Sequence, residues 1–190
     1  MIDGLRTMDD FSFDGKTVLL RVDINVPVDA SGNIKDDTRI QRSIPSIKEL
    51  SEKGAKTVIL AHQADPLDYH NFTCLSEHGK LLQEFLRKDV MYIDDVTGPA
   101  ARQAISHLNA GDILLLENLR IHTEETIFFE KQLKLSPKEQ AETIVVKKLS
   151  PLADIYLCDA FACVHRSEPS LVGFPQIIPS GCGRLFEQEL

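Results

Sequence analysis

The sequence predicts an α/β fold: a doubly wound parallel sheet with helices on both faces (Rossmann-like), in a single domain. Short runs rich in apolar and β-branched residues recur along the chain, and segments with helical spacing separate them. Most of these runs are continuously apolar rather than alternating, as expected for strands buried on both faces of a parallel sheet. Alternation of strands and helices also implies right-handed crossovers, which place helices on both faces.

Five runs are expected to form the strands. The chain has 190 residues, a length that suits one domain built on such a sheet, and it contains no internal repeat. The expected strands are Thr17–Ile24, Lys56–Ala61, Val90–Ile93, Asp112–Leu116 and Asp154–Leu157.

The first helix is predicted between the first two strands, where apolar residues recur at helical spacing and Gly54 supplies a stop. Pro45 lies inside this pattern and leaves two alternatives open. Either the proline kinks the helix, or the helix starts later with Ser43 as its N-cap. The residues that carry the periodicity are Ile40, Ile44, Ile47 and Leu50.

Further helices are predicted from their start signals. Thr73 is the expected N-cap of the second helix, and Pro99 opens the third. A capping box at Ser136–Glu139, with proline at the first helical position, starts a fourth helix that runs through Leu149. Gly181–Gly183 lacks the third glycine and the preceding strand of a dinucleotide fingerprint, so we interpret it as a turn before the last helix.

Composition excludes several classes of function. The formal net charge is -8, which argues against binding nucleic acid because such binding needs a basic face. No apolar run reaches the roughly 18 residues of a membrane span, and the first residues show no signal peptide. The four cysteines form no C-x-x-C pair, so we expect reduced thiols in a cytoplasmic protein rather than a zinc site.

Polar residues follow the predicted strands, at the edge where ligands of an open parallel sheet bind. Several are arginines, whose planar fork binds carboxylate or phosphate through two hydrogen bonds. Their clustering in an acidic chain predicts a site for a small anion with more than one acidic group. The alternative is that they are surface arginines paired with the many acids. The residues concerned are Arg21, Asp23, Asn25, Arg39, His62, Arg120, His122, His165 and Arg166.

The residues at this edge also bear on other kinds of chemistry. Asp23 and Asn25 suit hydrogen bonds to a substrate, although Asp and Asn before a proline are also ordinary turn residues. A phosphatase with Asp23 as nucleophile would want a second carboxylate where Asn25 stands. The chain has no G-x-x-x-x-G-K-[ST] loop for nucleotide phosphates. No metal site is expected, because His62, Cys158, Asp159 and His165 have no ligand spacing.

Several motifs, taken together and in order, resemble the phosphoglycerate kinase family. Leu20–Pro27 is similar to its R-V-D-F-N-V-P motif, and Asp37–Ile40 matches its D-x-R-I segment. Leu115–His122 and Asp159–Arg166 resemble two further family segments, L-L-E-N-x-R-F-H and D-A-F-x-x-x-H-R. Gly183–Leu190 resembles the helix that leads to the family's hinge, and His165–Phe174 is most similar to the archaeal branch.

The resemblance implies a reaction and a division of labour. The family transfers a phosphoryl group reversibly between ATP and 3-phosphoglycerate, giving 1,3-bisphosphoglycerate in glycolysis and gluconeogenesis. Residues 1–183 would form the amino-terminal domain that binds 3-phosphoglycerate, and 184–190 would begin the helix toward the hinge. The carboxy-terminal domain that binds Mg-ATP or Mg-ADP is absent from this chain, so no cofactor is expected here and the chain alone should be inactive.

The resemblance also assigns roles to individual residues. Asp23 and Asn25 would contact the glycerate part, and Arg39 would lie near the transferring phosphoryl group as the catalytic residue. Arg120 and Arg166 would bind anionic groups with His62 beside them. Asp65 stands where the family usually has an arginine, so a basic phosphate contact has become an acid. That departure keeps a second hypothesis open, a non-catalytic anion-binding module related to this domain.

Overall fold

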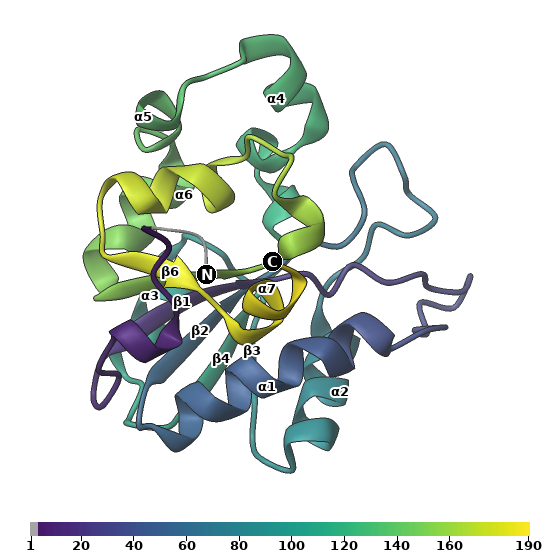
Figure 1. The fold of residues 1–190 in the computed structure, drawn as a ribbon. Helices are drawn as coiled ribbons and strands as arrows, with labels where there is room; N and C mark the ends of the chain where they lie inside the picture. Colours follow the sequence, from purple (N-terminus) through teal and green to yellow (C-terminus); the bar gives the residue numbers. More distant parts are fainter. Residues whose placement is uncertain (1–3) are drawn as a thin grey trace.

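A six-stranded parallel sheet forms the centre of the molecule (Figure 1). The computed structural model describes residues 4–190. The strand order is β3-β4-β2-β1-β5-β6. Strands β2, β4 and β3 therefore lie on one side of β1, with β3 at the edge, and β5 and β6 lie on the other side. The strands are β1 Thr17–Val22, β2 Lys56–Leu60, β3 Met91–Ile93, β4 Ile113–Leu116, β5 Ile155–Asp159 and β6 Ser180–Cys182.

Helices cover both faces of this sheet, which confirms the predicted fold class. Alternate strand residues point to opposite faces, and they separate the buried residues into two cores. Leu20 and Ile59 belong to the core that α1 and α2 cover. Leu19 and Leu60 belong to the core that α3 and α6 cover. The helices are α1 Thr38–Glu52, α2 Ser76–Leu86, α3 Pro99–Ser106, α4 Ile127–Leu133, α5 Pro137–Gln140, α6 Ile144–Leu149 and α7 Arg184–Glu189.

The first two helices differ from the prediction at their starts. Helix α1 begins at Thr38 and continues through Pro45, so the later start with Ser43 as N-cap is wrong. The Ser43 hydroxyl instead donates to the Arg39 carbonyl within the helix. Helix α2 has Leu75 rather than Thr73 as its N-cap residue. The Glu117 carboxylate, distant in sequence, accepts a hydrogen bond from the Leu75 backbone N–H. It therefore satisfies a backbone donor at the start of the helix, where the N-cap residue itself makes no side-chain hydrogen bond.

The predicted fourth helix is broken in two. Ser136 and Glu139 form the predicted capping box, but α5 ends at Gln140 and α6 starts after Thr143. The Glu124 carboxylate accepts hydrogen bonds from the first two backbone N–H groups of α6. This interaction comes from outside the segment, so the local pattern could not indicate the break.

Two elements were not predicted at all. Helix α4 has Thr126 as its N-cap. The strand β6 contains Gly181, which we interpreted as part of a turn, and it pairs with β5. A Cβ at Gly181 would lie 2.7 Å from Phe11 and 2.9 Å from the Arg6 carbonyl oxygen, so only glycine lets the amino-terminal segment pack against β6.

Within residues 4–190, no helix combines the length and the apolarity that crossing a membrane requires.

Candidate functional site

The candidate site lies beyond the carboxyl ends of β1, β2 and β5. The strand order reverses at β1, because β2 lies on one side of it and β5 on the other. Ligands of open α/β sheets bind at such a reversal. Asp23 follows β1, His62 follows β2, and the 3-10 turn Phe161–Cys163 follows β5, so the topology brings all three segments to one edge.

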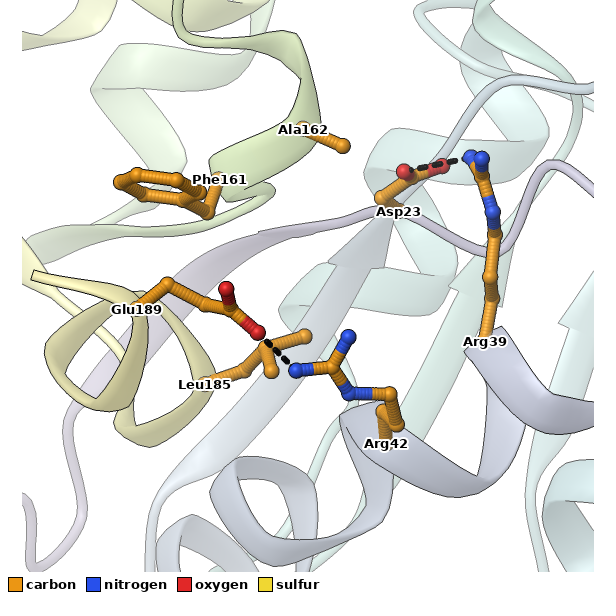
Figure 2. Close-up of a pocket in the computed structure, with 7 residues that line it drawn as sticks. All are labelled: Asp23, Arg39, Arg42, Phe161, Ala162, Leu185 and Glu189. Carbon is orange, nitrogen blue, oxygen red and sulfur yellow. Dashed lines mark hydrogen bonds and ion pairs between the residues drawn. The ribbon is translucent and has the colours of Figure 1, made fainter.

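Asp23 and Arg39 form an ion pair at this edge (Figure 2). Arg39 Nη1 donates to Asp23 Oδ2 at 2.7 Å. The Asp23 side chain is nearly buried, whereas half of the Arg39 side chain is exposed. Arg39 projects from the first turn of α1, so its guanidinium reaches the edge of the sheet while its backbone belongs to a rigid helix. The pair therefore presents a fixed carboxylate and an accessible cation side by side.

Asn25 holds the neighbouring loop rather than pointing freely to solvent. Its side-chain oxygen accepts from the Ala64 backbone N–H at 2.9 Å. Gln63 spans the same loops, donating to the Val26 carbonyl at 2.7 Å, and its own N–H is bound by the Asn118 side-chain oxygen at 3.0 Å. Sequence reasoning assigned no role to Gln63 or Asn118. Gln63 is the second residue after the predicted strand Lys56–Ala61, and Asn118 lies within the Leu115–His122 motif. These amides fix the loops that carry His62 and Asp65.

His62 is held neutral by its surroundings. Arg21 is fully buried, and its Nη2 lies 2.6 Å from His62 Nδ1. A guanidinium can only donate, so Nδ1 accepts and the neutral ring carries its proton on Nε2. Burial lowers the pKa of His62 well below its usual value, and the charges of Arg21, Arg120, Arg166 and Arg39 lower it further. His62 is thus a neutral Nε2–H donor in contact with Arg21 and within the influence of three further arginines.

Arg120 and Arg166 share one buried carboxylate. Glu168 lies 2.9 Å from Arg120 Nη2 and 3.0 Å from Arg166 Nη2, and its side chain is 1% exposed. Asp65 Oδ2 lies 3.7 Å from Arg120 Nη1, and Glu130 lies 2.9 Å from Arg166 Nε. The sequence predicted the two arginines at this edge, but it did not indicate Glu130 or Glu168 as their partners.

Glu125 adds a further buried carboxyl group behind this cluster. It accepts hydrogen bonds from the Ser170 backbone N–H and hydroxyl, both at 2.7 Å. Burial raises its pKa to about 7, the negative charge of Glu168 acts in the same direction, and Arg21 opposes them. Arg21 Nε in turn donates to the Ser170 hydroxyl, so Ser170 links the two ionisable side chains.

The arginines open onto separate hollows. Arg39 lines a hollow of about 150 Å³ between α1, the turn Phe161–Cys163 and α7, with Asp23 beside it (Figure 2). Arg39 also borders a second hollow of about 250 Å³ that Asn25 lines. Arg166 lines a third hollow of about 520 Å³, beside α4.

A trio of possible metal ligands lies in the same place. Single ligand atoms of Asp23, His62 and Cys163 lie within 4.8 Å of one another. This grouping differs from the residues weighed in the sequence, of which only His62 belongs to it. Arg39 and Arg21 contact Asp23 and His62 directly, so a cation there would face two fixed positive charges. The surroundings of this trio therefore disfavour a metal ion.

Comparison with known proteins places the chain in a family. The model of the family described as phosphoglycerate kinase matches residues 8–190. Curated phosphoglycerate kinases from Methanobacterium bryantii and Saccharolobus solfataricus are 54% and 48% identical over 97% of this chain. The chain spans 44% and 43% of the lengths of these two relatives, which is less than half of each.

Solved structures give the same result. The crystal structure of phosphoglycerate kinase from Pyrococcus horikoshii OT3 superposes with a TM-score of 0.90 at 43% identity, over 96% of this chain and 43% of the other. The structure of phosphoglycerate kinase from Coxiella burnetii gives 0.74 at 27% identity, over 97% of this chain and 43% of the other.

Proposed function

Because this chain belongs to the phosphoglycerate kinase family, we propose that it forms the part of such an enzyme that binds 3-phosphoglycerate or 1,3-bisphosphoglycerate. The complete enzyme would transfer a phosphoryl group reversibly between Mg-ATP and 3-phosphoglycerate in the cytoplasm. A carboxy-terminal domain outside this chain would bind the Mg nucleotide. The observation that carries the proposal is the gathering of arginines near His62 at the reversal of strand order: Arg21 contacts His62, and the charges of Arg39, Arg120 and Arg166 also lower its pKa.

The arrangement supports one role for Arg39 and another for Arg120 and Arg166. Arg39 is accessible on one side and paired with Asp23 on the other, so it can approach a transferring phosphoryl group without losing its anchor. Phosphoryl transfer depends mainly on positioning and charge stabilisation, which makes Arg39 the proposed catalytic residue. Asp23 and Asn25 would contact the glycerate part. The Asp23 carboxylate would accept from the glycerate hydroxyl, and the Asn25 NH2 and the His62 Nε2–H would donate to the glycerate carboxylate.

The phosphate of the substrate would lie toward Arg120 and Arg166. Both are guanidiniums that bind two oxygens at once, and both contribute to the positive potential at His62. Asp65 belongs to the same cluster through Arg120, so its negative charge acts directly on the proposed phosphate end.

We further propose that residues 1–183 form the substrate-binding domain and that 184–190 begin the helix to the hinge. Helix α7 starts after Gly183, and Arg184 binds Glu49 of α1 at 2.7 Å and Asp9 at 2.6 Å. These ion pairs attach the last helix to the body of the domain. Movement of a second domain would therefore be transmitted through α7 to α1, which carries Arg39.

Two measurements test the proposal. Isothermal titration of the 190-residue chain should detect 3-phosphoglycerate, and a coupled ATP assay of the same sample should show no turnover. In a chimera, this chain replaces the matching segment of the M. bryantii enzyme, to which it is 54% identical. The chimera should have kinase activity, and Arg39→Lys should lower its kcat by at least about a hundredfold, the loss typical of removing one transition-state donor.

A second candidate function is a non-catalytic anion-binding module, and Asp65 in place of an expected arginine favours it. The chimera separates the two candidates. A chimera that folds and binds 3-phosphoglycerate but has no turnover would support the binding module. Turnover by the 190-residue chain alone would contradict the proposed division of substrates between two domains.

A further inference from the structure

Glu168 is a buried carboxylate placed among three guanidiniums. Its oxygens lie 2.9 Å from Arg120, 3.0 Å from Arg166 and 3.9 Å from Arg21, and its side chain is 1% exposed. Pro169 follows it and favours the extended backbone observed at Glu168, with φ -98° and ψ 148°. The Glu168 carbonyl accepts from the Leu171 N–H at 2.9 Å, so the backbone fixes the residue as well.

Asp65 brings a second carboxylate to the same arginines. Its Oδ2 lies 3.7 Å from Arg120 Nη1, and the same oxygen accepts from the Ile127 N–H at the start of α4. The preceding residue, Ala64, has a φ of 52°, and the Asn25 side chain binds its N–H. A left-handed alanine is uncommon, so the loop is held in a conformation that turns Asp65 toward Arg120 rather than toward Arg39 or solvent.

Carboxylates therefore already occupy the contacts that a phosphate would need. Glu168, Asp65 and Glu130 surround Arg120 and Arg166, and Glu168 also lies near Arg21, so three carboxylates balance three guanidiniums. A guanidinium that is already paired gains less from a second anion, and uncompensated carboxylates repel it. Two buried donors of these arginines, the Nε–H groups of Arg120 and Arg166, have no hydrogen-bond partner among the described residues.

We propose that Glu168 and Asp65 are specificity-determining residues that act as built-in counter-anions of Arg120 and Arg166, so that the phosphate group of the ligand adds little to its affinity. This inference rests on the proposed function, and it concerns the phosphate end of that same site. The site of this chain then selects its ligand mainly through the glycerate end, at Asp23, Asn25 and Arg39. A phosphorylated and an unphosphorylated hydroxy acid would bind with similar affinity.

A purely structural role for Glu168 makes a different prediction. If Glu168 only neutralises buried arginines, its removal destabilises the fold and disorders the pocket, and the affinity for every ligand falls. If it competes with phosphate, its removal leaves a vacancy that phosphate fills. Affinity for phosphorylated ligands then rises, and inorganic phosphate restores the melting temperature that the substitution lowers.

The test uses Glu168→Gln, Asp65→Asn and the double variant in the 190-residue chain. Each keeps an oxygen acceptor and removes one charge. Glu77→Gln is the matched control, because it removes one charge from an exposed pair with Lys80 on α2. Titration calorimetry with 3-phosphoglycerate, D-glycerate and inorganic phosphate, together with melting temperatures, reads out affinity and stability.

Each single variant should tighten 3-phosphoglycerate binding by at least about tenfold, or about 1.4 kcal/mol, and the double variant by more. D-Glycerate affinity should stay within about twofold of the unsubstituted chain, which is less than half a kcal/mol. Inorganic phosphate should raise the melting temperature of Glu168→Gln more than that of Glu77→Gln.

Unchanged or weaker 3-phosphoglycerate binding in folded Glu168→Gln and Asp65→Asn would overturn the inference. If Glu168→Gln fails to fold even with phosphate present, Asp65→Asn decides alone, because Asp65 is 15% exposed and lies outside the core. Failure of the proposed function looks different. In that case neither 3-phosphoglycerate nor D-glycerate binds to any chain, including the unsubstituted one.

Discussion

Two histidines of this chain should carry their protons on opposite nitrogens. His62 Nδ1 accepts from Arg21, which leaves the proton on Nε2. His107 Nδ1 lies 2.7 Å from the Gln103 carbonyl oxygen, which can only accept, so there the proton lies on Nδ1. A neutral His62 is required by the proposed site, because an imidazolium would add a fifth positive charge beside four arginines.

Nitrogen-15 NMR of the imidazole rings checks this directly. The spectrum should show His62 with a bare Nδ1 and a protonated Nε2, and His107 should provide the opposite pattern in the same sample. Because the pKa of His62 is lowered well below its usual value, its signals should not move as pH falls from about 8 to about 5.5, a range in which an unperturbed histidine titrates. Protonation of His62 at about pH 6 would contradict the buried pairing with Arg21.

Glu125 should make stability depend on pH with an unusual sign. Its pKa is raised to about 7 by burial and by Glu168, whereas the unfolded value is 4.5. Between about pH 4.5 and pH 7 the folded state therefore holds a proton that the unfolded state has lost, and stability falls as pH rises through this window. His62 acts in the opposite direction, because its lowered pKa removes stability below its usual value.

The variant Glu125→Gln isolates this effect. Its amide oxygen can still accept from the Ser170 backbone N–H, whereas its NH2 group replaces the oxygen that accepts from the Ser170 hydroxyl. Urea unfolding across the same pH window should show the variant gaining stability relative to the unsubstituted chain as pH rises. Parallel curves for the two chains would mean that Glu125 titrates normally in the folded protein.

At the scale of elements, the attachment of α7 depends on Gly183. A Cβ at Gly183 would lie 2.4 Å from the Asp159 carboxylate, which accepts a hydrogen bond from the Phe186 N–H at 3.0 Å. The approach of this carboxylate to the start of α7 therefore requires glycine. The backbone angles at Gly183, φ -82° and ψ 178°, are open to any residue, so the requirement is one of space alone.

Gly183→Ala should therefore cost about 1–3 kcal/mol, the usual penalty for overpacking. Gly79→Ala in α2 is the matched control, since its Cβ would meet Leu115 at an ordinary 3.5 Å. There the gain in helix propensity should leave stability unchanged or raise it by up to about 1 kcal/mol. Urea midpoints measure both variants, and equal midpoints would show that Asp159 moves aside without cost.

The elements that the sequence predicted are those whose signal is local. Thr17–Val22 and Lys56–Leu60 are rich in apolar and β-branched residues, and both are central strands of the sheet. Strand β6 has three residues, one of them glycine, and forms only because β5 and the amino-terminal segment pack against it. The break between α5 and α6 likewise depends on Glu124, which is distant in sequence.

The same distinction holds for the candidate site. Parallel topology alone brings residues such as Asp23, His62 and Arg120 to one edge, because they follow strands that end there. Which carboxylates pair with the arginines depends on tertiary contacts such as that of Glu168 with Arg120. The sequence therefore indicated an anion site, but its internal charge balance required the structure.

At the scale of the whole molecule, the chain is acidic, whereas the site itself is close to neutral. The chain carries a formal net charge of -8. Within the site, every guanidinium around His62 has carboxyl neighbours, so the local field is nearly neutral. The guanidiniums are Arg21, Arg39, Arg120 and Arg166, and the carboxyl groups near them are Asp23, Asp65, Glu125, Glu130 and Glu168. An anionic ligand approaching the unsubstituted chain therefore experiences mainly long-range repulsion.

Salt should separate these two contributions. Screening acts on charges more than about 10 Å apart at 0.1 M salt and much less on buried pairs. Raising ionic strength from about 10 mM to about 150 mM should therefore leave 3-phosphoglycerate binding to the unsubstituted chain unchanged or slightly tighter. In the double variant of Glu168→Gln and Asp65→Asn, the attraction of Arg120 and Arg166 is uncompensated, so the same change in salt should weaken binding. Repeating the titrations with acetate in place of chloride distinguishes screening from competition by the salt anion. A similar loss of affinity with salt in both chains would show that the arginines attract the ligand despite their carboxylate neighbours.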